Sequence, residues 1–182
     1  MKDSINKTFN HFKIHTQYSI CEGAIKIEQL KDYCKTNKIQ SLGISDTHIL
    51  SGALEFSETL SSIGTQPIIG TQILFKYKNF TGLIPLIAKN SSGYKNIIEL
   101  SSKSYLENSE GTYPHCSFED LLIKSSGIIV LSGSIRCLIG DLFNRGLFNE
   151  IEEIISKLSK SFKDDLYIEI QRHKDLNEKE FE

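Results

Sequence analysis

Short apolar runs alternate with amphipathic windows along most of this chain. The runs are rich in β-branched and aliphatic residues, and the windows between them repeat apolar residues at helical spacing. The runs predict strands near residues 9–14, 41–45, 67–75, 82–88, 127–132 and 166–170. The windows predict helices over residues 26–37, 52–63, 92–105, 117–124, 137–144 and 147–162. Alternation of this kind predicts an α/β fold with a largely parallel sheet.

One pair of runs departs from this alternation. The runs 67–75 and 82–88 are separated by a short polar stretch that contains Lys78-Asn79, which predicts an antiparallel hairpin. In the helical window 92–105, Ile97 and Ile98 are both expected to face the core.

Composition indicates one globular domain. The 182 residues are 39% hydrophobic, which is enough for a real core, and we expect a single domain over 8–182 after a polar extension, 1–7. With 21 basic and 23 acidic residues, the net charge of −2 does not suit a surface that grips a phosphate backbone by charge alone. No apolar run approaches the ~18 residues of a membrane span, and no secretory leader is recognisable. These features favour a cytoplasmic protein.

The four cysteines carry no metal or disulfide signature. They are widely spaced and form no C-x-x-C pair, so we expect reduced, mostly buried thiols rather than a disulfide framework or a zinc cluster. They are Cys21, Cys34, Cys116 and Cys137.

The stretch from Phe9 to Ser19 carries the most distinctive chemistry. It is a short apolar run that contains His11, Lys13 and His15, and in a regular strand these alternate positions share one face. Three imidazoles there would form the floor of a metal site, because neutral histidine is a common ligand of zinc and related ions. The ammonium of Lys13 has the wrong charge for a ligand.

Six pieces of sequence, in order, resemble the PHP (polymerase and histidinol phosphatase) domain found at the amino terminus of the bacterial DNA polymerase III alpha subunit. The pieces are His11 to Ser19 with Gly23-Ala24; Ser45-Asp46 with Ser51 to Phe56; Gln66 to Gly70; Leu86 to Asn90 with Gly93 to Asn96; Leu131 to Gly133; and Tyr167 to His173. The resemblance implies a distorted βα barrel of the PHP type. In the family this barrel continues beyond the last matching piece, so we expect it to be incomplete at the C-terminus.

Active members of the family bind a cluster of metal ions at the C-terminal rim of the barrel and hydrolyse phosphoesters, because bound metals generate hydroxide and stabilise the developing charge. The resemblance implies that this metal site is degraded here. The retained positions are His11, His15 and Asp46, whereas Lys13, Thr47 and Gln72 replace family ligands. His48 stands one residue late, at the glycine position of active relatives, and is a weak candidate ligand. No catalytic residue is assigned.

Several local arrangements remain open at this level. Lys13 is expected to pair with Asp46 or with another carboxylate across the site. His15 and Asp46 are expected to hydrogen-bond each other or Lys13, with binding of one residual metal as the alternative. His48 is expected to be an exposed loop residue, or else to swing into the missing ligand position. Arg172, after the run 166–170, is expected to anchor an ion pair.

The function implied by the resemblance is a non-catalytic module of a DNA-synthesising polypeptide. Its partners would be the polymerase palm and thumb, the proofreading exonuclease subunit and, through the parent chain, primer-template DNA, with no membrane. No cofactor is expected for this segment, whereas the parent polymerase would use Mg. The alternatives are a stand-alone PHP-family metal-dependent phosphoesterase or 3'-5' exonuclease holding Zn or Mn, and a decayed or truncated gene product.

Overall fold

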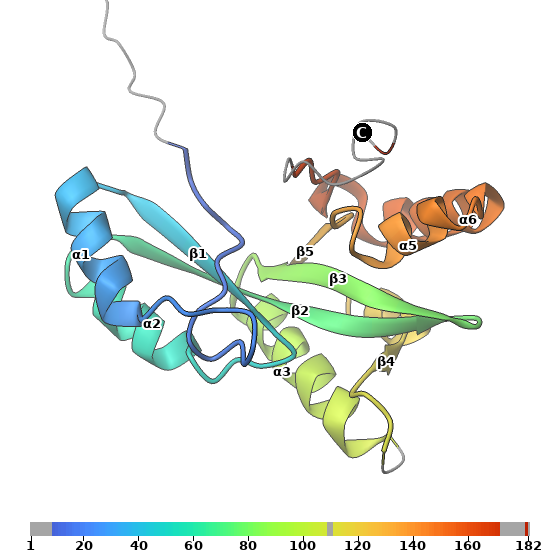
Figure 1. Cartoon of the computed structure of the whole chain (residues 1–182), viewed down its shortest axis with the longest axis horizontal. Helices are drawn as coiled ribbons and strands as arrows, with labels where there is room; N and C mark the ends of the chain where they lie inside the picture. Colours follow the sequence, from blue (N-terminus) through green and yellow to red (C-terminus); the bar gives the residue numbers. More distant parts are fainter. Residues whose placement is uncertain (1–8, 109–110, 172–180, 182) are drawn as a thin grey trace, which may run out of the picture.

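The computed structural model describes residues 9–108, 111–171 and 181, and the statements that follow concern this part of the chain (Figure 1). The strands are β1 (Ser41–Thr47), β2 (Gln66–Tyr77), β3 (Phe80–Ala88), β4 (Cys116–Ser117), β5 (Ile128–Leu131) and β6 (Leu166–Tyr167). The α-helices are α1 (Ile27–Asn37), α2 (Ala53–Ser61), α3 (Ser91–Leu106), α4 (Phe118–Ile123), α5 (Leu138–Asn144) and α6 (Phe148–Phe162). A 3-10 turn, η1 (Lys163–Asp165), precedes β6. The predicted helices are therefore confirmed, with small differences at their ends.

The strands form one mixed sheet in the order β1-β2-β3-β5-β6, with β4 paired to the far part of β2. The β1–β2, β2–β4 and β5–β6 pairs are parallel, whereas β2–β3 and β3–β5 are antiparallel. The predicted hairpin is confirmed, since Tyr77 faces Phe80 across a turn formed by Lys78 and Asn79. Because β3 runs back beside β2 and also pairs with β5, the sheet is less parallel than the sequence predicted.

The run 9–14 lies beside β1 but is not a regular strand, which corrects the prediction. Two backbone bonds join it to β1: Gly43 N–H donates to the carbonyl of His11 (2.7 Å), and Ser45 N–H donates to that of Ile14 (2.8 Å). In a parallel ladder an advance of two residues on one strand matches two on the other. Here two residues of β1 match three of the run, so one extra residue interrupts the ladder and its alternation.

The last predicted strand is also shorter than expected. Only Leu166 and Tyr167 pair with β5, at Val130 and Leu131. Beyond them the Ser132 hydroxyl, rather than a strand carbonyl, accepts the Glu169 N–H at 2.9 Å. The run 166–170 therefore leaves the sheet after two residues because a side chain takes over the backbone bonding.

Two apolar clusters hold the helices against the sheet. The larger packs α3, α4, α5 and α6 against β2, β3 and β5, and the smaller packs α1 and α2 against β1. In Figure 1, α1 and α2 accordingly lie at the opposite end of the sheet from α5 and α6. Ile97 is buried as predicted, but Ile98 is 40% exposed, so that part of the predicted α3 face is wrong.

The cysteines are unpaired in the described chain, and three of the four are buried. Cys34, Cys116 and Cys137 lie inside, whereas Cys21 is exposed. Burial raises the pKa of the Cys116 thiol to about 12, so this thiol stays protonated at neutral pH. No helix among the described residues is both long and apolar enough to cross a membrane.

Candidate functional site: a polar rim beside an apolar groove

The extra residue between His11 and Ile14 sends the three alternate side chains to different places. His11 is exposed and lies edge-on to the Phe9 ring, with ring centroids 4.8 Å apart. Lys13 reaches Glu169, and His15 reaches Gln72. The expectation that positions 11, 13 and 15 share one face is therefore wrong.

Gly43 of β1 allows this path. A Cβ atom at position 43 would lie 2.8 Å from the Cα of Phe12 and 2.9 Å from its carbonyl oxygen. These separations are shorter than van der Waals contact, so only glycine lets the irregular segment lie this close to β1. Sequence reasoning did not assign a role to this glycine.

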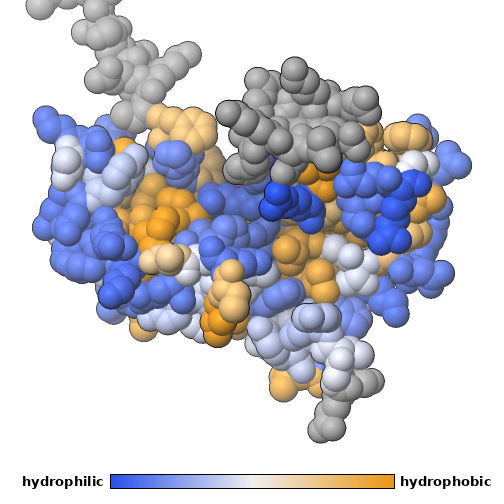
Figure 2. Space-filling model, viewed as in Figure 1, coloured by the Kyte–Doolittle hydropathy of each residue, from blue (hydrophilic) through white to orange (hydrophobic). Residues whose placement is uncertain are grey.

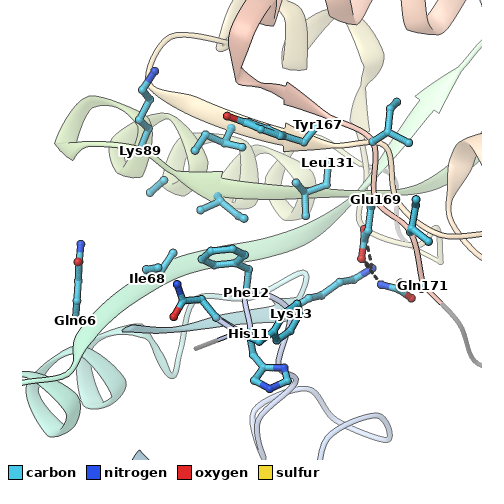
Figure 3. Close-up of a pocket in the computed structure, with 17 residues that line it drawn as sticks. His11, Phe12, Lys13, Gln66, Ile68, Lys89, Leu131, Tyr167, Glu169 and Gln171 are labelled. Carbon is cyan, nitrogen blue, oxygen red and sulfur yellow. Dashed lines mark hydrogen bonds and ion pairs between the residues drawn. The ribbon is translucent and has the colours of Figure 1, made fainter. Parts of the chain in front are cut away.

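Lys13 forms an ion pair across the molecule. Its Nζ lies 3.2 Å from Oε1 of Glu169 and 3.4 Å from Oε2. The two side chains are 16% and 11% exposed, so the pair is largely shielded from water. The Gln171 amide also donates to Glu169 (Figure 3). Of the two expected pairings, the one with another carboxylate is confirmed and the one with Asp46 is wrong.

Asp46 lies at the end of β1 and is 1% exposed. Its Oδ1 accepts the Thr16 N–H and the Ser19 hydroxyl, both at 2.6 Å, and its Oδ2 accepts the Thr16 hydroxyl at 2.7 Å. These three donors satisfy a buried carboxylate without a cation. The expected hydrogen bond between Asp46 and His15 is replaced by these contacts.

His15 joins a second set of polar side chains. Its Nε2 lies 3.1 Å from the amide nitrogen of Gln72, and its Nδ1 lies 3.5 Å from the Ser19 hydroxyl and 3.7 Å from Glu22. Because an amide nitrogen only donates, Nε2 of His15 accepts and Nδ1 carries the proton. Both imidazole nitrogens are therefore engaged by protein groups.

Thr47 and Gln72 also face this cluster. Thr47 donates to the Glu22 carboxylate at 2.5 Å, and the Gln72 amide lies 3.5 Å from the Thr47 hydroxyl. Gln72 is 4% exposed. Both side chains thus bond to their neighbours, and Glu22 is a participant that sequence reasoning missed.

His48 adopts a left-handed backbone conformation, with φ at 67°. Its N–H donates to the Gln72 carbonyl at 2.7 Å, and its carbonyl accepts the Ser101 hydroxyl at 3.1 Å. The side chain is half-buried rather than exposed, and its buried Nδ1 has no partner. Burial lowers the pKa of His48, which keeps the imidazole neutral at pH 7.

These side chains do not assemble a conventional ligand cluster. Among the described residues, no three His, Cys, Asp or Glu side chains come close enough together to hold a metal ion. Arg172 and His173 lie outside the described residues, so the ion pair expected for Arg172 stays a prediction.

A cavity of about 870 Å³ lies on the sheet face next to the Lys13–Glu169 pair; we call it the central groove. Its floor is apolar and comes from β2, β3 and β5: Ile68, Ile87, Ile129 and Leu131. One wall is the segment Phe9–Lys13, and the other is the segment Tyr167–Gln171. Figure 3 shows Lys13 and Glu169 meeting at one end of the groove, with Gln66 and Lys89 toward the other.

The surface around the groove is mixed in polarity. Phe9, Tyr167, Ile168 and Ile170 on its two walls are all more than half exposed, at 75%, 54%, 68% and 60%. On the face seen in Figure 2, apolar patches lie between hydrophilic areas. Exposed apolar side chains of this kind commonly mark a surface that another polypeptide covers.

Comparison with known families identifies the class to which this fold and rim belong. The sequence profile of the PHP domain matches residues 11–173. The chain therefore belongs to the PHP domain family.

Within this family the similar curated proteins are bacterial DNA polymerase III alpha subunits. The chain is 33% identical over 182 residues to that of Caulobacter vibrioides, and the alignment covers 95% of the chain and 16% of the relative. It is 34% identical to the subunit of Rickettsia felis over 178 residues, covering 95% and 14%. For Aquifex aeolicus the identity is 33% over 191 residues, covering 92% and 16%. The chain thus spans about one sixth of the length of the relatives it matches.

Two solved structures align with the chain at low identity. An amidohydrolase from Chromobacterium violaceum aligns with a TM-score of 0.44 at 13% identity, over 53% of this chain and 33% of its own. A putative metal-dependent phosphoesterase from Bifidobacterium adolescentis aligns with a TM-score of 0.41 at 16% identity, over 85% and 55%. At these scores neither match bears on the function of this chain.

Proposed function

We propose that this chain is the PHP domain of a bacterial replicative DNA polymerase, with a degraded metal site and a structural, partner-binding role. The observation that carries the proposal is the identity of about one third, along nearly the whole chain, to DNA polymerase III alpha subunits. In this proposal the domain is a βα barrel of the PHP type whose remaining strands lie in polypeptide beyond these residues.

The proposed context supplies the rest of the enzyme. The palm and thumb, the proofreading exonuclease subunit and primer-template DNA are the proposed partners, and the Mg of DNA synthesis belongs to the parent polymerase. The work is proposed to take place in the cytoplasm. The charge balance supports the proposal that DNA is bound by other parts of the polymerase, since 21 basic and 23 acidic residues do not make this segment a phosphate-binding surface by themselves.

The occupied rim supports the loss of the metal site. A multi-metal centre requires carboxylate oxygens and imidazole nitrogens that are free to coordinate. Asp46 instead accepts three protein donors, and both nitrogens of His15 face protein groups. Lys13 brings a fixed positive charge to the same end of the sheet. These residues do not fit the family's metal cluster, and no hydrolytic step is assigned to them.

The test is the mass of the native polypeptide that carries this segment. Peptides from 9–19 and 166–173 would identify the band in the source cell. We expect a mass many times 20.6 kDa, as for a replicative polymerase. A mass near 20.6 kDa would remove the polymerase from the proposal.

Metal analysis of the same polypeptide tests the degraded site separately. We expect no zinc or manganese held at the PHP domain after dialysis. Near-stoichiometric zinc or manganese there, together with hydrolysis of a simple phosphodiester, would instead favour the PHP-family phosphoesterase or exonuclease.

A further inference from the structure

We infer that the Lys13–Glu169 ion pair is a fixed cross-link that joins the two edges of the curved sheet at the end of the central groove. The inference deepens the proposed function, because it rests on the degraded metal site. It assigns a positioning role to Lys13 and Glu169, and to Ser132 and Gln171 behind them.

The two partners come from opposite edges of the sheet. Lys13 belongs to the segment that lies beside β1, the first strand in the sheet order, and Glu169 follows β6, the last strand. The two residues are 156 positions apart in the sequence. In Figure 3 the side chain of Lys13 extends along the end of the groove to reach Glu169.

Each partner is held in place by its own segment. The carbonyls of His11 and Ile14, on either side of Lys13, accept hydrogen bonds from β1. Glu169 donates its N–H to the Ser132 hydroxyl at 2.9 Å, which anchors it to the end of β5, and Gln171 donates to its carboxylate. An ion pair gains most when its partners are held in position before they meet, because less side-chain entropy is lost on pairing.

Because the pair is shielded from water, each charged side chain is stabilised mainly by its partner. The side chains are only 16% and 11% exposed, so removal of one leaves the other charged and poorly hydrated. Breaking such a pair destabilises a protein far more than breaking a surface pair.

A comparison pair lies on the rim of the same groove. Lys89 Nζ contacts Asp165 at 2.7 Å, but the Lys89 side chain is 52% exposed. Lys89 lines the groove toward its other end and its partner precedes β6, so this pair has the same chemistry beside the same groove but is more exposed. Lys89→Met is therefore the matched control.

The experiment is a double-mutant cycle on the full polypeptide, read by thermal unfolding of the PHP domain. We expect Lys13→Met and Glu169→Gln each to lower the melting temperature by about 5–10 °C, and the double variant to fall by clearly less than the sum. Lys89→Met should lower it by no more than about 2 °C. Strictly additive losses at positions 13 and 169 would overturn the inference.

Amide hydrogen exchange separates a cross-link from a general stabilising contact. In Lys13→Met, exchange should accelerate about tenfold or more both at the Gly43 and Ser45 amides, which donate to the first segment, and at the Glu169 amide, while the β2–β3 hairpin is unchanged. Acceleration confined to Gly43 and Ser45 would overturn the inference.

Two further measurements cover the remaining outcomes. If a single variant does not fold, the double variant Lys13→Glu with Glu169→Lys, which exchanges the two charges, decides: a folded domain supports the cross-link, and an unfolded one rejects it.

Added ZnCl₂ or MnCl₂ should leave the melting temperature of the unaltered protein unchanged. A rise would count against the degraded site of the proposed function, whereas the mutant cycle would still report on the cross-link.

Discussion

Thr16 donates two hydrogen bonds to Asp46, from its N–H to Oδ1 at 2.6 Å and from its hydroxyl to Oδ2 at 2.7 Å. Thr16 is fully buried and Asp46 nearly so. The loop that follows the irregular first segment is thus fastened to the end of β1 through one carboxylate. The Asp46 carboxylate therefore organises the backbone around it.

The buried contact between Thr16 and Asp46 predicts that removal of the Thr16 hydroxyl destabilises the protein. Thr16→Val keeps the shape of the side chain but leaves Oδ2 of Asp46 without its donor, so we expect a loss of about 1–3 kcal/mol in the free energy of unfolding. Denaturant titration measures the change. Thr47→Val is the control, because its hydroxyl contacts the exposed Glu22 and its loss should cost about 0.5 kcal/mol. Equal losses would contradict the organising role of Asp46.

Gly93 in the first turn of α3 should not tolerate a side chain. A Cβ atom there would lie 1.6 Å from the carbonyl oxygen of Gly127, which itself accepts the Lys89 N–H at 2.9 Å. We expect Gly93→Ala to cost at least about 2–3 kcal/mol because α3 must move away from the loop before β5. Gly64→Ala, at φ of 77° with open space around it, should cost only about 1 kcal/mol of backbone strain.

Asp120 should give the domain an acid-dependent stability. Burial alone raises its pKa, but hydrogen bonds from Lys103 and Ser117 outweigh burial and leave the pKa below its usual value. Because the unfolded chain then takes up the proton first, the stabilisation is complete above about pH 4 and is lost as the pH falls through the folded-state pKa.

The variant that tests this is Asp120→Asn, which removes the charge that faces Lys103. We expect it to be less stable than the parent by about 0.5–1 kcal/mol at pH 7, and equally stable near pH 2. Unfolding curves at the two pH values measure the difference. A constant Asp120→Asn deficit at both pH values would refute the assignment.

Glycine should destabilise the protein less than alanine at position 48. At φ of 67° a Cβ atom is strained, so we expect His48→Gly to be more stable than His48→Ala by about 1 kcal/mol. At the preceding position, within β1, the order should reverse, with Thr47→Ala more stable than Thr47→Gly by about 0.5–1 kcal/mol. Chemical denaturation of the four variants provides the comparison, and the same order at both positions would contradict the strain at His48.

Local pattern predicted much of this fold because most of its elements bury one consistent face. The helices carry apolar residues at a period that survives in the structure, and the turn at Lys78-Asn79 marks the hairpin directly. Ile98 departs from the pattern because α3 buries Ile97 and Leu100, and the adjacent position turns outward. The short β4 carries only two paired residues, which is too few for a recognisable period.

The resemblance picked out residues that lie together, but not their connections. His15, Asp46, Thr47 and Gln72 meet where the end of β1 pairs with the middle of β2. The extra residue near Lys13 has no signature in an apolar run, since Phe12 and Ile14 suit either backbone path. The partner of Lys13 is set by a segment 156 residues away, and such pairings depend on how the sheet curves.

The separation of Lys13 and Glu169 also matters while the chain is being made. Lys13 leaves the ribosome 156 residues before its partner, so the first segment has no ionic contact with the far edge until the segment after β6 has been made. Contacts of such long sequence separation form late and slow the final folding step. The nascent domain would therefore expose the apolar floor of its groove until the segment after β6, which forms one wall, emerges.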